Sequence, residues 1–397
     1  MQPEVVRLDT SPLQLATPAW SAPSPSCATP DEAVAALHQY VANGDTAKAL
    51  AVADQAVRTW PAHVPLLLAA ANLAKRVGRS VAAYHLLQAA ERSGSAQAAT
   101  ERRILVNQCA PHWHFRMMND EVRNQAYDRA LLHYVNDDSI VLDIGCGAGL
   151  LSMMAARAGA RHVYACEVSE LMADQARAIM RNNGFAERIT VINRLSNHLK
   201  VGRELPEKAD IVVAEVFDTG LLGENALRTF DHAREHLLKP DGRILPLSAS
   251  VQAVLLESEL LRKEAVTTRC CGFDVTSLNA LAPPYVQARL SAFPHHVLSE
   301  PLTVGHYGFQ RSIDANDSRL VEFEATRAGT CHGVAFWFTL DFGQGITMST
   351  GPENRWNCWM QAVSAFESPV RVQAAERVRV RYAELSNQLL QFSPASS

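Results

Sequence analysis

The sequence lacks the features that mark secreted, membrane-spanning and nucleic-acid-binding proteins. No run of about 18 consecutive apolar residues is present, and a run of that length is needed to cross a bilayer. The first ten residues, MQPEVVRLDT, show no charged-then-apolar leader pattern. Lys and Arg number 37 against 41 Asp and Glu, so the net charge of −4 gives no basic surplus for nucleic-acid phosphates. We therefore expect a cytoplasmic protein that binds neither membranes nor nucleic acid directly.

Paired cysteines are also missing. The eight cysteines form no C-x-x-C pair, and the adjacent Cys270 and Cys271 are poorly suited to a disulfide with each other. Widely spread thiols are typical of reduced, intracellular proteins rather than of disulfide frameworks or zinc sites. Because the sequence has no cluster of His and Cys ligands, we expect no bound metal. The length of 397 residues allows two or three domains.

The N-terminal hundred residues contain two segments of different composition. Residues 1–29 are rich in proline and serine and show little periodicity, which predicts a flexible tail. Residues 30–100 consist of alanine- and leucine-rich segments with helical spacing, in which Gly44 and Gly78 lie 34 residues apart. A period of this length resembles the tetratricopeptide repeat (TPR). A plain helical extension is the alternative. Two repeats are fewer than the three usually needed for independent stability, so we expect the array to lean on the next domain.

The remaining sequence predicts two further domains. Residues 101–246 alternate between strand-like and helix-like segments, which predicts a parallel sheet with crossover helices. Residues 247–397 read mainly as antiparallel strands of a β-barrel, with a loop-and-helix insertion at about 265–300. The expected fold class is therefore α/β, a Rossmann-like sheet followed by a β-barrel and preceded by the all-α segment.

A glycine-rich loop predicts a cofactor site. In VLDIGCGAGLLS, Gly145, Gly147 and Gly149 follow a strand and open a helix, where glycine allows a tight turn and a close ligand. The G-x-G-x-G spacing departs from the G-x-G-x-x-G of dinucleotide sites. Glu167 ends the next strand and can accept hydrogen bonds from both hydroxyls of a ribose, although it could instead be a solvated carboxylate. Together with LLKPDGRILP at 237–246, the pattern resembles class I methyltransferases and indicates S-adenosylmethionine.

Two acids predict the chemistry. Glu215 and Glu224 lie on a loop that leaves the carboxyl end of the strand ADIVVAE, where open α/β sheets bind ligands. Two carboxylates that face one pocket repel each other unless a cation lies between them. A guanidinium fits because it is planar, always charged and donates to both carboxylates. The alternative is that both glutamates are merely solvated. Asp218, between them, is either a third carboxylate of the pocket or a helix N-terminal cap.

From about residue 112 to the C terminus, the sequence resembles protein arginine methyltransferases. Asp120, Arg123 and Tyr127 fit the Asp-x-x-Arg-x-x-x-Tyr stretch of that family, and Glu215 and Glu224 fit its double-Glu loop. The resemblance implies that Arg123 binds the carboxylate of S-adenosylmethionine with His114 beside it, that Glu167 holds the ribose, and that Ser196 and Asn197 flank the adenine. It also implies that Trp359 belongs to the substrate-binding Thr-His-Trp loop.

The resemblance further implies a homodimer and a protein substrate. The insertion at about 265–300 resembles the dimerisation arm of the family, and the TPR-like segment would help to recruit an arginine-containing protein. Three departures are visible. The chain has one catalytic module, although members of the TPR-bearing branch carry two. Asn357 and Cys358 replace Thr and His before Trp359, so Asp120 is expected to lose its partner. ILVNQ replaces an aromatic segment ahead of the core.

We therefore expect a protein arginine N-methyltransferase that uses S-adenosylmethionine. Two other functions compete with it: a class I methyltransferase for a small molecule, and a repeat-bearing scaffold that binds the cofactor without turnover. The protein substrate is undefined by the sequence, and so is the choice between mono-, symmetric and asymmetric dimethylation, because that choice depends on the shape of the pocket.

Overall fold

The computed structural model describes residues 27–395, so almost all of the tail expected at 1–29 lies outside the described residues. The chain divides into two compact units: residues up to 112 together with 169–175 form the first, and residues 113–168 together with those from 176 onward form the second. Among the described residues, no helix combines the length and apolarity that crossing a membrane requires.

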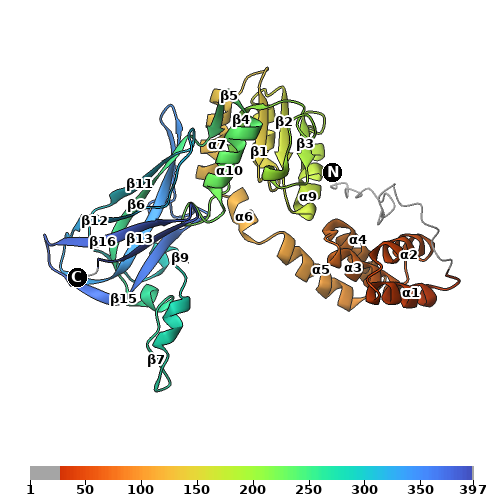
Figure 1. Cartoon of the computed structure of the whole chain (residues 1–397), viewed down its shortest axis with the longest axis horizontal. Coiled ribbons are helices and arrows are strands. Elements are labelled where there is room, and N and C mark those ends of the chain that lie inside the picture. Colours follow the sequence, from red (N-terminus) through yellow and green to blue (C-terminus); the bar gives the residue numbers. More distant parts are fainter. Residues whose placement is uncertain (1–26, 396–397) are drawn as a thin grey trace, which may run out of the picture. The chain divides into compact units, whose positions relative to one another are not determined.

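The first unit is built from helices, as expected (Figure 1). These are α1 (Pro30–Ala42), α2 (Thr46–Thr59), α3 (Val64–Arg76), α4 (Ser80–Arg92) and α5 (Ala96–Cys109). Because α1 and α3 begin at residues 30 and 64, and α2 and α4 at 46 and 80, both pairs are offset by 34 residues. Fully buried alanines such as Ala49 and Ala83 occupy equivalent places and let the helices pack closely.

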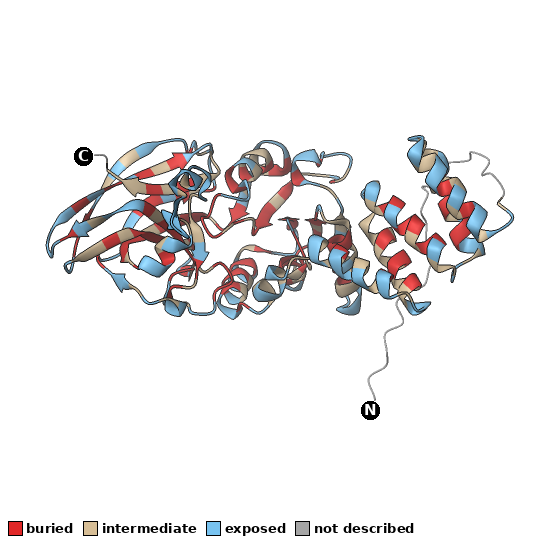
Figure 2. Ribbon diagram, turned by 90° about the horizontal axis from the view of Figure 1, so that it is seen from below, coloured by how far each residue is buried: buried red, intermediate tan, exposed pale blue. Residues whose placement is uncertain are grey.

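The second unit begins with the predicted parallel sheet, which is confirmed. Its strands run in the order β3-β2-β1-β4-β5, and every pairing is parallel. They are β1 (Ile140–Ile144), β2 (His162–Cys166), β3 (Ile189–Ile192), β4 (Ala209–Ala214) and β5 (Leu238–Leu245). All five residues of β1 are buried, as expected for a central strand, and buried residues follow the sheet in Figure 2. The strand order reverses between β1 and β4, so ligands are expected at the carboxyl ends of these two strands.

Helices cover this sheet and carry several candidate residues. They are α6 (Trp113–Met118), α7 (Glu121–Tyr134), α8 (Leu150–Arg157), α9 (Glu170–Asn182), α10 (Ala226–His232), the π-helical turn η2 (Ala233–Leu237) and the 3₁₀ turn η1 (Ser196–His198). The side chain of Asp120 caps α7 by accepting a hydrogen bond from the Arg123 backbone N–H. Gly149, with φ of 82°, precedes α8.

The antiparallel β domain is also confirmed. One sheet has the order β10-β6-β13-β15-β9, with β11 paired to β6 and β14 to β13, and the second has the order β12-β16-β17. The strands of the first sheet are β6 (Ser248–Glu257), β9 (Val286–Ala288), β10 (His296–Val297), β11 (Leu302–Gly308), β13 (Gly329–Gly343), β14 (Ile346–Ser349) and β15 (Gln361–Val372). Those of the second are β12 (Ser318–Glu324), β16 (Arg377–Leu385) and β17 (Leu389–Pro394).

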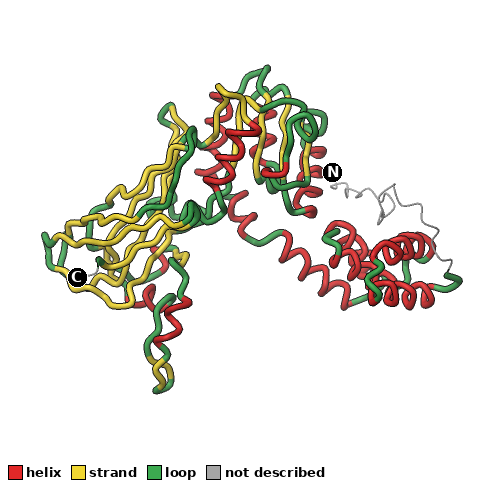
Figure 3. Tube along the Cα trace, viewed as in Figure 1, coloured by secondary structure: helices red, strands yellow, loops and turns green. Residues whose placement is uncertain are grey.

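The insertion expected at about 265–300 is shorter in the structure. Its last part contains β9 and β10, which pair with β15 and β6 and therefore belong to the sheet. Residues 266–284 remain outside the main sheets, and we call them the arm. They contain the two-stranded hairpin of β7 (Arg269–Cys270) and β8 (Phe273–Asp274) and the 3₁₀ turn η3 (Thr276–Leu281), which Figure 3 shows projecting from the strands. The short helix α11 (Glu259–Lys263) precedes it.

Candidate active site

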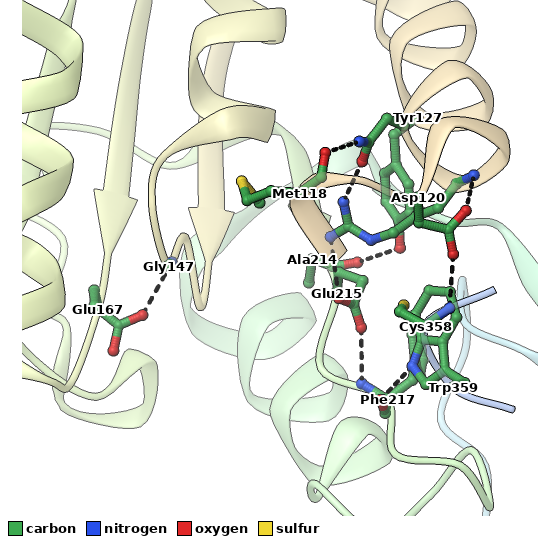
Figure 4. Close-up of polar contacts among 12 residues, drawn as sticks. Met118, Asp120, Tyr127, Gly147, Glu167, Ala214, Glu215, Phe217, Cys358 and Trp359 are labelled. Atoms are coloured by element: carbon green, nitrogen blue, oxygen red, sulfur yellow. Dashed lines mark hydrogen bonds and ion pairs between the residues drawn. The ribbon is translucent and has the colours of Figure 1, made fainter. Parts of the chain in front are cut away.

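The glycine loop lies against the carboxyl end of β2. The Gly147 N–H donates a hydrogen bond to Oε2 of Glu167, at 3.0 Å, and Glu167 is buried directly after β2 (Figure 4). Gly145 and Gly147 have φ of 74° and 52°, which favour glycine. A Cβ atom at Gly149 would lie 2.3 Å from Cε of Met180 on α9. The loop is therefore packed against α9, and the φ of 82° at Gly149 favours glycine there.

His114, Ser196 and Asn197 lie near this loop or on the neighbouring strand end. A Cβ atom on Gly147 would lie 3.6 Å from Nδ1 of His114, which places the α6 imidazole over the loop. Burial lowers the pKa of His114, so its ring is neutral at pH 7. Ser196 is buried and Asn197 exposed on η1, which follows β3. Asn193 connects that strand end to the glycine-loop partner, because its Nδ2 donates to the backbone oxygen of Glu167 at 2.8 Å.

Arg123 and Glu215 form a buried ion pair. Nη2 of Arg123, on α7, lies 3.0 Å from Oε2 of Glu215, which follows β4, and both residues are less than 9% exposed. Nη1 donates to Oδ1 of Asn124 at 2.7 Å, whereas Nε has no hydrogen-bond partner within residues 27–395. Burial raises the pKa of Glu215, and the charge of Arg123 opposes that rise. The family resemblance assigns Arg123 to the cofactor and Glu215 to the substrate arginine, and in the structure these two residues contact each other directly.

Glu224 completes the acid pair on the same loop, residues 215–224, which we call the acid loop. The pKa of Glu224 is raised to about 7. Desolvation by the surrounding protein is the largest cause, and the negative charges of Glu215 and Asp218 add to it. The residue as a whole is nevertheless exposed, so a ligand can reach it. Glu224 therefore lies close enough to Glu215 and Asp218 for their negative charges to repel one another. Such an arrangement is expected where the ligand is a cation.

Asp218 is not a helix cap, so that alternative was wrong. Asn225 precedes α10 and makes no side-chain cap. Asp218 instead accepts a hydrogen bond from the Gly223 N–H at 2.7 Å and another from the hydroxyl of Tyr285. The carboxylate therefore braces the acid loop internally, and both of its oxygens have a protein donor.

The loop of Asn357, Cys358 and Trp359, which we call the tryptophan loop, contacts Asp120 at the start of α7 and Phe217 on the acid loop. The Cys358 N–H donates to Oδ2 of Asp120 at 2.8 Å, and Trp359 Nε1 donates to the backbone oxygen of Phe217 at 2.8 Å (Figure 4). Asp120 thus lacks the imidazole partner of the family pattern, as expected, but accepts the backbone N–H of Cys358 instead. Burial raises the pKa of the Cys358 thiol, which is neutral at pH 7.

Three polar residues at this site are absent from the sequence predictions. Asp143, in β1, accepts a hydrogen bond from Ser152 at 2.6 Å, and burial raises its pKa to about 7. Its place in VLDIG, two residues before the glycine loop, was the available signal. Tyr285 and Gln287 contact the acid loop from β9 and the residue before it. Tyr285 and Gln287 alternate with the apolar Val286 and Ala288, which is a weak indication of a strand. The segment was interpreted as a loop.

Comparisons with known proteins agree with this arrangement. Residues 125–246 match the family described as ribosomal protein L11 methyltransferase, and residues 248–389 match the arginine methyltransferase oligomerization subdomain. The chain is 41% identical over 272 residues to an arginine N(omega)-methyltransferase of Streptomyces achromogenes subsp. streptozoticus, covering 68% of this chain and 75% of that protein.

Two eukaryotic proteins are also similar. Protein arginine N-methyltransferase 7 of Aedes aegypti is 39% identical over 262 residues, which cover 59% of this chain but only 38% of that protein. The chain thus spans well under half the length of this relative. The structure of a Trypanosoma brucei PRMT1 enzyme–prozyme heterotetrameric complex with AdoHcy superimposes with a TM-score of 0.62 and 27% identity, covering 70% of this chain and 89% of that one.

The raised pKa of Glu224 predicts a pH-dependent effect of Glu224→Gln on stability. Between the ordinary value of 4.5 and about 7, the folded protein keeps a proton that the unfolded chain has lost, so stability falls as pH rises through about 7. Glutamine removes this loss. Thermal melting should show a gain of about 2 °C over the wild type at pH 8, and much less at pH 5. Glu187→Gln, at an exposed turn, is the control; a gain that is equal at both pH values would contradict the assignment.

Proposed function

This chain belongs to the protein arginine methyltransferase family, and we propose that it transfers the sulfonium methyl group of S-adenosylmethionine to a guanidino nitrogen of arginine in a protein. The acid loop lies beside the glycine loop, where a Cβ atom at Gly145 would lie 3.2 Å from Cγ1 of Val216. The observation that carries the proposal is the repulsion there between the exposed Glu224 and the other two acids of the loop, Glu215 and Asp218. A planar cation is the ligand that relieves this repulsion.

The residues around the glycine loop fit S-adenosylmethionine. Nε of Arg123 is a buried donor without a partner in the described part of the chain, and a carboxylate of the cofactor would satisfy it. Glu167 would accept hydrogen bonds from the ribose, and His114, Ser196 and Asn197 would line the remaining surface. The three loop glycines admit a ligand close to the backbone. When bound, the cofactor supplies an electrophilic methyl group on sulfur.

The acid loop would hold the arginine. Oε2 of Glu215 is engaged by Arg123, whereas Oε1 has only a 3.4 Å contact with the Phe217 N–H, so we assign Oε1 to the substrate guanidinium. Glu224 would bind a second guanidinium nitrogen. These contacts would draw positive charge away from the third nitrogen and would leave its lone pair facing the methyl group that the cofactor supplies. Methyl transfer to that nitrogen would release one proton, which the ionised and exposed Glu224 would pass to solvent.

One observation favours a second candidate, the methylation of arginine as a small molecule. The relative at 41% identity is named for arginine rather than for protein arginine. The helical first unit supports a protein substrate instead, because its 34-residue offset fits TPR repeats, which bind protein segments. The retained pair of Glu215 and Glu224 argues against a scaffold without turnover.

The arm and the thiols support a homodimer in the cytoplasm. The arm exposes Phe273, Leu278 and Leu281 at 72%, 58% and 81%, an apolar surface that a second copy of the chain would cover in a homodimer. None of the cysteines among residues 27–395 is joined in a disulfide, which suits the reducing cytoplasm.

Glu224→Gln tests the acid loop directly. Glu224 makes no ion pair with Arg123, so its loss should lower methyl transfer about 10²–10³-fold and change S-adenosylhomocysteine affinity only a few-fold. Glu215→Gln should weaken both, because Arg123 loses its charge partner. Mass spectrometry of an arginine-rich peptide and of free arginine, incubated with labelled cofactor, gives the activity, and calorimetry gives the affinity.

Wild-type turnover by Glu224→Gln would refute the assignment of this residue. Methylation of free arginine alone by the wild type would replace the proposed protein substrate with the small molecule.

Shortening the arm tests the homodimer. A Gly-Ser linker in place of residues 268–283 removes the exposed apolar side chains and keeps Tyr285 and its contact with Asp218. We expect a monomer by light scattering and at least tenfold lower activity. Phe273→Ser, a milder change, should weaken association without removing the arm. A fully active monomer would exclude this role for the arm.

Removal of residues 1–112 tests the recruitment of substrate. The cut follows α5, which ends at Cys109, so no helix of the first unit is divided. We expect KM for a whole arginine-rich protein to rise about tenfold or more, while KM for a short arginine peptide stays within twofold of the wild type, since the peptide needs only the acid loop. Equal losses on both substrates would show that the helices serve stability alone.

A further inference from the structure

Three polar side chains alternate along the strand that follows the arm. Tyr285, Gln287 and Arg289 precede, lie within and follow β9, and residues at a spacing of two share one face of a strand. All three donate hydrogen bonds to loops of the candidate active site. β9 itself is held in the sheet by its pairing with β15, so the row has a rigid base.

The row reaches both loops of the site. Nε2 of Gln287 donates to Oγ1 of Thr219 at 2.6 Å and to the backbone oxygen of Trp359 at 2.8 Å. Nη2 of Arg289 donates to the backbone oxygen of Asn357 at 3.2 Å. The acid loop and the tryptophan loop are thus joined to each other through β9, in addition to the direct bond between Trp359 and Phe217.

Tyr285 makes the contact nearest to the acids. Its hydroxyl donates to Oδ2 of Asp218, whose Oδ1 accepts the N–H of Gly223, the residue before Glu224. A Cβ atom at Gly220 would lie 2.4 Å from the Tyr285 hydroxyl oxygen, and one at Gly223 would lie 2.5 Å from Cγ of Asp218. The ring and the loop are therefore packed without spare space, and both glycines are required for this approach.

These contacts link β9 to the residue before Glu224 through Tyr285 and Asp218. β9 fixes Tyr285, Tyr285 bonds Asp218, and Asp218 fixes the Leu222–Gly223 peptide group, one residue before Glu224, by accepting its N–H. Glu224 itself is exposed and forms no ion pair with any residue in 27–395, unlike Glu215. Its placement therefore depends on the backbone of the acid loop.

We propose that Tyr285 is a positioning residue for arginine binding, which holds Glu224 in place through Asp218. The inference rests on the proposed function of the acid loop and adds a residue to it that touches neither arginine nor cofactor. A phenylalanine at position 285 would fill the same space and remove only the hydroxyl, so it tests the hydrogen bond alone.

The test compares Tyr285→Phe with Tyr382→Phe in the full chain. The substitution Tyr382→Phe also removes a hydrogen bond of a tyrosine hydroxyl, the buried one with Tyr307. Position 382 is in β16, away from the acid loop. Tyr285→Phe should raise KM for an arginine peptide about tenfold and leave S-adenosylhomocysteine affinity within twofold. Hydrogen exchange of residues 216–224 should become faster. Tyr382→Phe should change none of these three quantities.

The double variant Asp218→Asn/Tyr285→Phe separates positioning from general packing. If Tyr285 acts through Asp218, the double variant should be no worse than Asp218→Asn alone. Additive losses would overturn the proposal, and so would wild-type exchange of residues 216–224 in Tyr285→Phe. A wild type without methyl transfer would refute the proposed function. Hydrogen exchange requires no turnover, so it would still decide whether Tyr285 holds the acid loop.

Discussion

The buried pair of Arg123 and Glu215 determines how the two halves of the candidate site are arranged. Arg123 lies on the helix that precedes the parallel sheet and Glu215 on the loop that follows β4, so the 3.0 Å contact joins segments 92 residues apart. Neither charge is stable alone in a buried environment, and loss of one partner would leave the other uncompensated. The pair therefore ties α7 to the acid loop. That loop lies beside the glycine loop, because a Cβ atom at Gly145 would lie 3.2 Å from Cγ1 of Val216, and we propose that methyl transfer takes place there.

Backbone groups support this pair where the family pattern uses a side chain. Asp120 accepts hydrogen bonds from the N–H groups of Arg123 and Cys358, so it caps α7 and anchors the tryptophan loop at once. A backbone donor is insensitive to the residue that carries it, and this explains how cysteine fits at position 358 without a charged partner for Asp120. The neutral thiol adds no charge to a site that already contains three acids.

Sequence patterns were sufficient for features that depend on neighbouring residues. Apolar runs of suitable length predict β1 to β4, whereas β5 has polar residues in its middle and was recognised only from the stretch LLKPDGRILP. The glycine loop follows from its place between a strand and a helix. The pairing of Arg123 with Glu215, the bracing of Asp218 and the row of Tyr285 and Gln287 depend on segments that meet only in the fold. β9 has three residues and follows two prolines, so no periodicity distinguished it from the arm.

The central claim is that the acid loop binds a guanidinium. Carbon NMR of labelled Glu224 can follow its titration in the presence of S-adenosylhomocysteine, with and without an arginine peptide. A bound cation should stabilise the ionised carboxylate, so the pKa should fall from about 7 to below about 5 when the peptide is added. A titration curve that stays at about 7 with saturating peptide would contradict the account.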